Sequence, residues 1–192
     1  YPALMQSGVD RLAIEGMAVV AGCGGGNAID ASMPRLLSGA RQLVLDADAL
    51  NALARNPAWG PVVEARADGT TALTPHPLEA ARLLGCSTAE VQANRLASAQ
   101  RLAQQFNCTV VLKGSGTVVA NPDTLPRINP TGNARLAIAG TGDVLAGLLG
   151  SLMAQGHGAF EAACYACYRH GQAADRWTQP STLTAADLAR QM

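Results

Sequence analysis

The sequence contains few charged residues, few aromatic residues and a single lysine. Charged residues account for 15% and aromatic residues for 4% of the 192 residues, and the formal net charge is zero. The chain has no run of basic residues and no basic stripe with interleaved aromatics, which are the usual patterns of proteins that bind nucleic acid or anionic membranes. We find no apolar stretch long enough to span a bilayer and no signal peptide, and we expect neither a membrane nor a nucleic-acid partner.

Cysteine is also sparse. The five cysteines are Cys23, Cys86, Cys108, Cys164 and Cys167, an odd number without regular spacing. This pattern fits reduced thiols and predicts a cytoplasmic protein. Cys164 and Cys167 have C-x-x-C spacing, but they lie in an alanine-rich helical stretch, where helix packing is the favoured interpretation and a zinc or redox role is the alternative.

Short apolar runs that alternate with helical patterns are abundant. A chain of 192 residues, 48% of them hydrophobic, is long enough to bury a core, and we expect a single domain over residues 1–192. The alternation predicts an α/β fold with a mainly parallel sheet and helices on both faces. The expected strands lie near residues 17–21, 42–45, 71–73, 109–112, 117–120 and 127–129, and the expected helices lie near residues 28–37, 49–51, 77–84, 87–106, from 143, 159–177 and from 184.

A glycine-rich turn at residues 140–143 precedes one of these helices. Gly140 and Gly142 allow a tight turn, and unpaired N–H groups at a helix start bind anions. Gly140, Thr141 and Gly142 are therefore a candidate anion hole. We expect the helix to start at Asp143, whose carboxylate is a candidate general base on a substrate hydroxyl. The alternative is that Asp143 simply caps the helix.

Lys113 is the second candidate ligand contact. It is the only lysine, and every other member of the 14 Lys and Arg residues is an arginine. It follows a β-branched run typical of a buried parallel strand, and Gly114, Gly116 and Thr117 come after it. Open α/β sheets bind ligands at the carboxyl ends of their strands. Lys113 is therefore a candidate ligand contact. The alternative is that it is a solvated lysine in a loop.

Several polar or glycine-rich segments share a position in the predicted fold, because each follows a strand or opens a helix. In a parallel sheet these positions lie along one edge and can line one crevice. Each has an ordinary alternative: Asp46 and Asp48 could cap the next helix, His76 could be an exposed turn residue, Glu79 could satisfy a helix dipole, and residues 22–26 could be a loop without a ligand. Taken singly, the ordinary interpretation is favoured for Asp48, Glu79 and residues 22–26. The segments are residues 22–26, Asp46 with Asp48, residues 74–76, Lys113 and residues 140–143.

In several of its motifs the sequence resembles the ADP-dependent NAD(P)H-hydrate dehydratases, which are carbohydrate-kinase-like domains with a ribokinase-type fold. The resemblance covers nearly the whole chain, with the motifs in order. The motifs are VLDADALN at 44–51, LTPHPLE at 73–79, VLKG at 111–114 with Thr117, GN at 132–133, GTGDVLAG at 140–147, His170-Gly171 with Asp175, and TAADL at 184–188.

The resemblance implies a repair enzyme that removes water from hydrated NADH or NADPH and consumes ADP or ATP. It implies that Asp143 binds the hydrated nucleotide and acts as the base, and that His76, Gly24 and Gly26 also contact this substrate. Magnesium is expected with the nucleotide phosphates, and no metal ligand can be assigned from the sequence. The residues implied to hold the adenine nucleotide are Lys113, Gly114, Ser115, Gly116, Thr117 and Gly142.

Two departures from the family pattern bear on this assignment. Cys23 stands where the family usually has proline, and Gly25 stands where it has a bulkier apolar residue. The family's domain also extends upstream through a first βα portion, which we expect this chain to lack. We therefore predict that the isolated chain is not an active monomer: either the missing portion is present as a separate piece, or the chain associates with copies of itself as a homo-oligomer.

Two other functions remain open on the sequence. A small-molecule kinase of the same fold would use the same aspartate and anion loop and would release a stable phosphate ester. A nucleotide-binding module without catalysis would bind ADP without turning over the hydrate.

Overall fold

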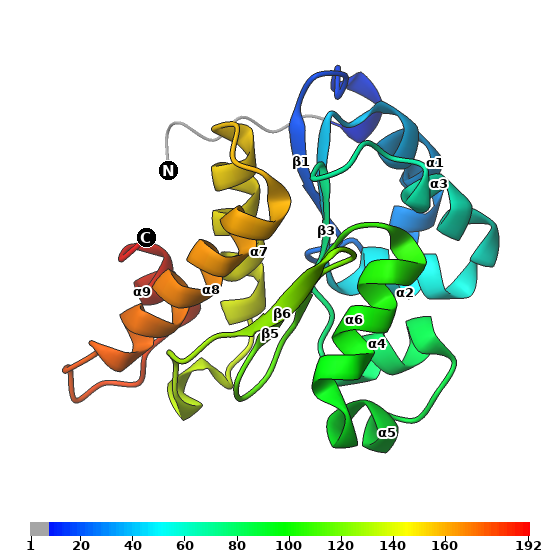
Figure 1. Ribbon diagram of the computed structural model, residues 1–192. Coiled ribbons are helices and arrows are strands. Elements are labelled where there is room, and N and C mark those ends of the chain that lie inside the picture. Colours follow the sequence, from blue (N-terminus) through cyan, green and yellow to red (C-terminus); the bar gives the residue numbers. More distant parts are fainter. Residues whose placement is uncertain (1–7) are drawn as a thin grey trace.

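The computed structural model describes residues 8–192 (Figure 1). Its strands are β1 (Ala18–Ala21), β2 (Gln42–Leu45), β3 (Thr71–Leu73), β4 (Thr109–Leu112), β5 (Val118–Asn121) and β6 (Thr124–Ile128). They form one sheet in the order β1-β2-β3-β4-β5-β6. Strands β1 to β4 pair in parallel, and β5 and β6 continue the sheet antiparallel. The predicted mainly parallel sheet is confirmed.

Helices cover both faces of this sheet (Figure 1). One face carries α1 (Ile29–Gly39), α2 (Ala47–Arg55), α3 (Gly60–Glu64), α4 (Pro77–Leu84), α5 (Thr88–Ala93) and α6 (Arg95–Phe106). The other carries α7 (Thr141–Ala154), α8 (Ala159–Asp175) and the short α9 (Ala185–Ala189). Four single-turn 3₁₀ helices are η1 (Val9–Arg11), η2 (Gly26–Ala28), η3 (Pro57–Trp59) and η4 (Ala134–Leu136).

Alternate residues of the central strands point into two separate cores. Leu43 and Leu45 of β2 pack with the α1–α6 layer, whereas Val44 between them packs with α7 and α8. In β4, Leu112 belongs to the first core and Val111 to the second. This alternation follows from the two-residue period of a strand and explains why both strands read as continuous apolar runs.

One predicted helix is wrong in its extent. The capping box at Ser87 is present, since Ser87 Oγ accepts from Glu90 N and the Glu90 carboxylate accepts from Ser87 N. The single helix expected over residues 87–106 is instead divided at Asn94, which adopts φ −137° and ψ 55°. Asparagine competes with helical backbone bonding, and the break turns the chain before α6 begins.

The cysteines are unpaired in the described part of the chain. Cys167 is buried in the core between α7, α8 and the sheet, and Cys164 is packed against that core. Their place on α8 supports the packing interpretation of the C-x-x-C spacing. Within residues 8–192, every helix is too short or too polar to cross a membrane.

Candidate functional site

The carboxyl ends of the parallel strands bring distant polar residues together. Lys113, just after β4, places its ammonium Nζ 2.6 Å from Oδ1 of Asp46, just after β2. The Asp46 side chain is 1% exposed and that of Lys113 19% exposed. Lys113 is therefore not the solvated loop lysine of the alternative interpretation. The expectation that Asp46 caps α2 is also wrong, because it occupies the N-cap position without a side-chain capping bond.

Asp48 has a different partner and does not cap α2 through its side chain either. Its Oδ2 accepts from the backbone N–H of Gly26 at 2.7 Å and so closes the glycine-rich loop after β1. In that loop, Gly24 and Gly26 have φ of +74° and +54°, values that favour glycine. Gly22 is constrained further, since a methyl group there would lie 1.8 Å from Asp46 O.

The residues predicted to form an anion hole lie at the start of α7, which begins two residues earlier than expected. Gly140 takes the N-cap position with φ +85°, and the helix begins at Thr141 rather than at Asp143. Asp143 is therefore not the capping residue, and its side chain is exposed. The N–H groups of the first helical turn have no acceptor within the helix. The Thr141 hydroxyl donates toward Leu136 O and Ile138 O at 2.8 and 3.0 Å. Only the backbone N–H of Thr141 could therefore contribute to an anion site.

The Lys113–Asp46 pair lies directly beside this helix start. A methyl group at Gly142 would be 3.4 Å from Lys113 Nζ and 3.9 Å from Asp46 Oδ2. The ammonium, although paired with Asp46, therefore lies next to the partial positive charge of the helix end. Together they favour a negatively charged group above Gly142.

Cys23 joins the cluster, which the sequence did not indicate. The Cys23 sulfur and a carboxylate oxygen from each of Asp46 and Asp143 lie within 4.8 Å of one another. Partial burial and then the charges of the two carboxylates raise the pKa of the Cys23 thiol to about 12. The thiol therefore stays protonated at neutral pH and hydrogen-bonds the Asp143 side chain.

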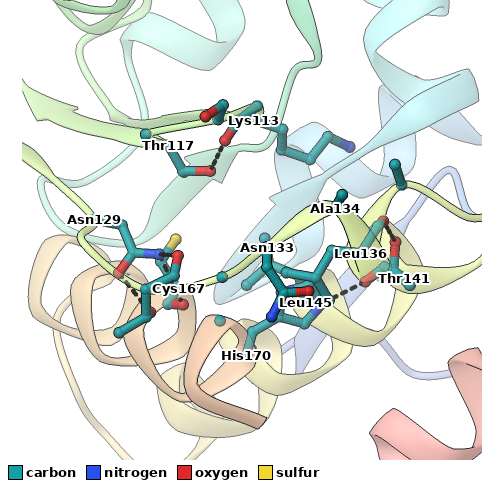
Figure 2. A pocket seen from close by; sticks show the side chains of 18 residues that line it. Lys113, Thr117, Asn129, Asn133, Ala134, Leu136, Thr141, Leu145, Cys167 and His170 are labelled. Atoms are coloured by element: carbon teal, nitrogen blue, oxygen red, sulfur yellow. Dashed lines mark hydrogen bonds between the residues drawn. The ribbon is translucent and has the colours of Figure 1, made fainter. Parts of the chain in front are cut away.

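A cavity of about 410 Å³ opens beside the cluster (Figure 2). The loop after β4 forms one wall, the segment after β6 and η4 form another, and α7 and α8 form the floor. The predicted nucleotide-binding residues line this cavity, whereas Asp143, His76, Gly24 and Gly26 lie outside its lining. Its lining residues include Lys113, Gly114, Ser115, Gly116, Thr117, Asn129, Asn133, Gly142, Leu145 and His170.

The segment after β6, which forms one wall of the cavity, is hydrogen-bonded to α8. The sequence analysis did not anticipate these bonds. Asn129 Nδ2 donates to Cys167 O at 3.2 Å, and Thr131 Oγ1 donates to Tyr168 O at 2.9 Å. A methyl group at Gly171 would lie 2.3 Å from Thr131 Oγ1, so the close approach of this wall requires glycine there.

Asp175 completes the same attachment at the end of α8. Its two carboxylate oxygens accept from Gly132 N and Asn133 Nδ2, each at 2.8 Å. The family motifs pointed to Asp175 and to residues 132–133 separately. The structure shows that they form one contact.

His170 connects the cavity floor to the anion hole. It is buried, and its Nε2 lies 2.8 Å from Thr141 O. Burial lowers the pKa of His170, while the bond to Thr141 opposes the shift. We therefore assign a neutral ring whose Nε2–H donates to the carbonyl of the first residue of α7.

His76 begins α4 with a reciprocal capping box. Its Nδ1 accepts from the backbone N–H groups of Leu78 and Glu79 at 3.1 and 3.4 Å, and Glu79 Oε2 accepts from His76 N at 2.8 Å. Glu79 is buried, which confirms its interpretation as a helix-start residue. The ring stays about half exposed at 46%, and Pro75 O accepts from Lys113 N at 2.9 Å. His76 therefore lies one residue from a direct contact with Lys113.

Similar proteins share both sequence and fold with this chain. An ADP-dependent (S)-NAD(P)H-hydrate dehydratase of Neisseria meningitidis serogroup B is 44% identical over 98% of the chain and 65% of its own length. An ADP/ATP-dependent NAD(P)H-hydrate dehydratase of Bacillus subtilis, co-crystallised with ATP/Mg2+, is 31% identical with a TM-score of 0.75 over 90% of this chain and 61% of its own. The chain thus spans less than two thirds of the length of both relatives.

A ribokinase-like superfamily protein of Enterococcus faecalis has a TM-score of 0.70 and 23% identity over 84% of this chain and 55% of its own. At that identity the likeness shows the fold alone, which is the ribokinase-type fold expected from the motifs. Residues 4–192 match the family described as NAD(P)H-hydrate dehydratase, and the chain belongs to that family.

Proposed function

We propose that the protein removes water from hydrated NADH and NADPH in a reaction coupled to the cleavage of ADP. The observation that carries this proposal is that Lys113 Nζ lies beside Gly142 at the edge of the cavity, while the carboxylate of the next residue, Asp143, lies beside Asp46, the partner of Lys113. A phosphoryl group above Gly142 would have the ammonium and the helix N–H groups around it and a carboxylate base within reach. The name of the meningococcal relative supports ADP as the nucleotide.

The cavity offers a place for the nucleotide. The loop of residues 113–117 would hold its phosphates through backbone N–H groups, and the start of α7 would take the terminal phosphoryl group. The hydrated nicotinamide would approach from the other side, along the loop of Gly24 and Gly26 and past His76. In this arrangement the substrate hydroxyl would lie next to Asp143.

The proposed chemistry resembles that of a kinase in its first step. Asp143 takes the hydroxyl proton, the hydroxyl oxygen bonds to the terminal phosphorus of ADP, and the bond from that phosphorus to the bridging oxygen breaks, which leaves AMP. The ring C–O bond then breaks and inorganic phosphate leaves with the electron pair. Loss of a proton from the neighbouring ring carbon restores the double bond of the dihydronicotinamide.

The described residues do not form a dedicated magnesium cage. Cys23, Asp46 and Asp143 could meet at one ion, but Lys113 already neutralises Asp46 and the Cys23 thiol stays protonated. Magnesium binds through one or two carboxylates together with nucleotide phosphates. We therefore expect any magnesium to bind through the phosphates of the nucleotide.

An absorbance assay tests the proposal. Hydrated NADH is mixed with the protein and with ADP or ATP in parallel, and the return of the near-ultraviolet absorbance of NADH is followed. We expect NADH to form with ADP, with AMP and phosphate released in equal amounts. A stable phosphate ester in place of NADH would instead identify a small-molecule kinase, and ADP binding without turnover would identify a non-catalytic module.

A further inference from the structure

Arg95, the first residue of α6, lies behind the loop that lines the cavity. Its Nη2 donates toward three backbone carbonyls, Leu112 O at 3.0 Å, Lys113 O at 3.3 Å and Gly116 O at 3.4 Å. Its Nη1 donates to Gln92 Oε1 at 2.9 Å. One guanidinium group thus contacts both ends of the loop of residues 113–117.

These contacts decide which way the loop's N–H groups face. In a trans peptide the carbonyl and the N–H of the following residue point in opposite directions. Because the carbonyls of Lys113 and Gly116 turn toward Arg95, the N–H groups of Gly114 and Thr117 turn away from it. Gly114 and Thr117 line the cavity, so donors directed away from Arg95 are available to a ligand on the opposite side.

The backbone of the loop of residues 113–117 packs closely against the Arg95 guanidinium. Gly114 and Gly116 have φ of +142° and +63°, and a methyl group at Gly114 would lie 3.0 Å from Arg95 Nη1. Thr117 Oγ1 also donates to Gly114 O at 3.0 Å, which closes the loop on itself. Glycine at 114 thus suits the positive φ of the turn and leaves room for the close approach of the guanidinium.

The charge of Arg95 suits this task. The side chain is half-buried, and burial lowers the pKa of its guanidinium, yet arginine remains charged in proteins. A guanidinium presents several donors in a fixed planar arrangement, whereas a lysine ammonium is a point charge on a flexible stem. Lysine at this position would satisfy fewer of the three carbonyls at once.

We propose that Arg95 is a positioning residue that holds the loop of residues 113–117 in the shape that binds a nucleoside diphosphate, without touching the nucleotide itself. The inference rests on the proposed function for the identity of the ligand. The position of the loop in the free protein does not depend on which ligand it binds. The role of Arg95 and the proposed function can therefore be tested separately.

The test compares Arg95→Met and Arg95→Lys with the unmodified protein. Arg101→Met is the matched control, because Arg101 lies exposed on the same helix. Two quantities are measured: hydrogen–deuterium exchange of the loop without nucleotide, and the Kd for ADP by calorimetry. We expect Arg95→Met to speed exchange in the loop and to raise the Kd about tenfold or more, with kcat at saturating ADP changed less than about twofold.

Arg95→Lys is expected to fall between Arg95→Met and the unmodified protein, and Arg101→Met to match the unmodified protein in both measurements. A folded Arg95→Met with unchanged loop exchange and unchanged Kd overturns the proposal. If Arg95→Met does not fold, the same two readouts on Arg95→Lys decide it. An unmodified protein that binds no ADP contradicts the proposed function, and the exchange data then still decide whether Arg95 holds the loop.

Discussion

The ammonium of Lys113 and the carboxylate of Asp46 lie 2.6 Å apart although 67 residues separate them in the chain. Asp46 is almost fully buried, and a buried carboxylate needs a charged or hydrogen-bonded partner, which Lys113 supplies. The pair also fixes where the ammonium points, which is toward Gly142 at the start of α7. If Lys113 binds the nucleotide as proposed, we expect ligand binding and stability to be coupled at this residue.

Lys113→Met tests this coupling. Loss of the ammonium removes a charged contact to phosphate, and we expect the free energy of ADP binding to weaken by about 1.5–3 kcal/mol. It also leaves the Asp46 carboxylate buried without its partner, so the free energy of unfolding should fall by about 3 kcal/mol or more. Calorimetry with ADP and urea denaturation measure the two effects.

The double variant Asp46→Asn/Lys113→Met separates the two effects. Removing the buried charge along with its partner should restore most of the lost stability, whereas ADP affinity should stay as weak as in Lys113→Met. If the double variant bound ADP like the unmodified protein, Lys113 would have no direct part in nucleotide binding.

Asp143→Asn tests the proposed base. The amide keeps the shape of the side chain but cannot accept a proton, so turnover of the hydrate should fall by about 10²-fold or more. The Kd for ADP and the stability should change little, because the side chain is exposed and Gly140 occupies the N-cap position. Asp123→Asn, at another exposed aspartate, is the control. An Asp143→Asn variant with most of its activity would remove this residue from the mechanism.

Gly22→Ala tests the close approach between the loop after β1 and Asp46. A methyl group there would lie 1.8 Å from Asp46 O, and φ is +110°. We expect the free energy of unfolding to fall by at least about 2 kcal/mol. At Gly24, where φ is +74° and a methyl group meets nothing within 4 Å, alanine should cost only about 1 kcal/mol. Equal losses at the two positions would contradict the packing described here.

His170 predicts a dependence of stability on pH. Burial lowers the pKa of His170 below its ordinary value of about 6.5 in the folded protein, so below about pH 6.5 the unfolded chain binds more protons than the folded one. This contribution to stability is fully present above that pH and is lost as the pH falls below it. Urea denaturation at about pH 7.5 and about pH 5.5 measures the loss, which should be smaller in His170→Gln than in the unmodified protein. An equal loss in both would show that His170 does not titrate as described.

Much of the fold was predictable because its signals are local. The β-branched run before Lys113, the helix start at Ser87 and the helix start at Thr184 each depend on residues close in sequence, and all three are present. The helix that breaks at Asn94 was not predictable from its capping signal, since a cap reports where a helix begins and not where it ends.

The sequence by itself determined the alternation of strands and helices, the glycine turn before α7, and the candidates Lys113 and Asp143. These follow from backbone preferences and side-chain chemistry that act over a few residues. Only the tertiary structure decided that Asp46 pairs with Lys113, that Arg95 holds the loop of residues 113–117, and that Asp175 binds the wall after β6. Each of these contacts joins residues about 20 to 70 positions apart, and their partners are chosen by how the strands and helices pack rather than by any local pattern.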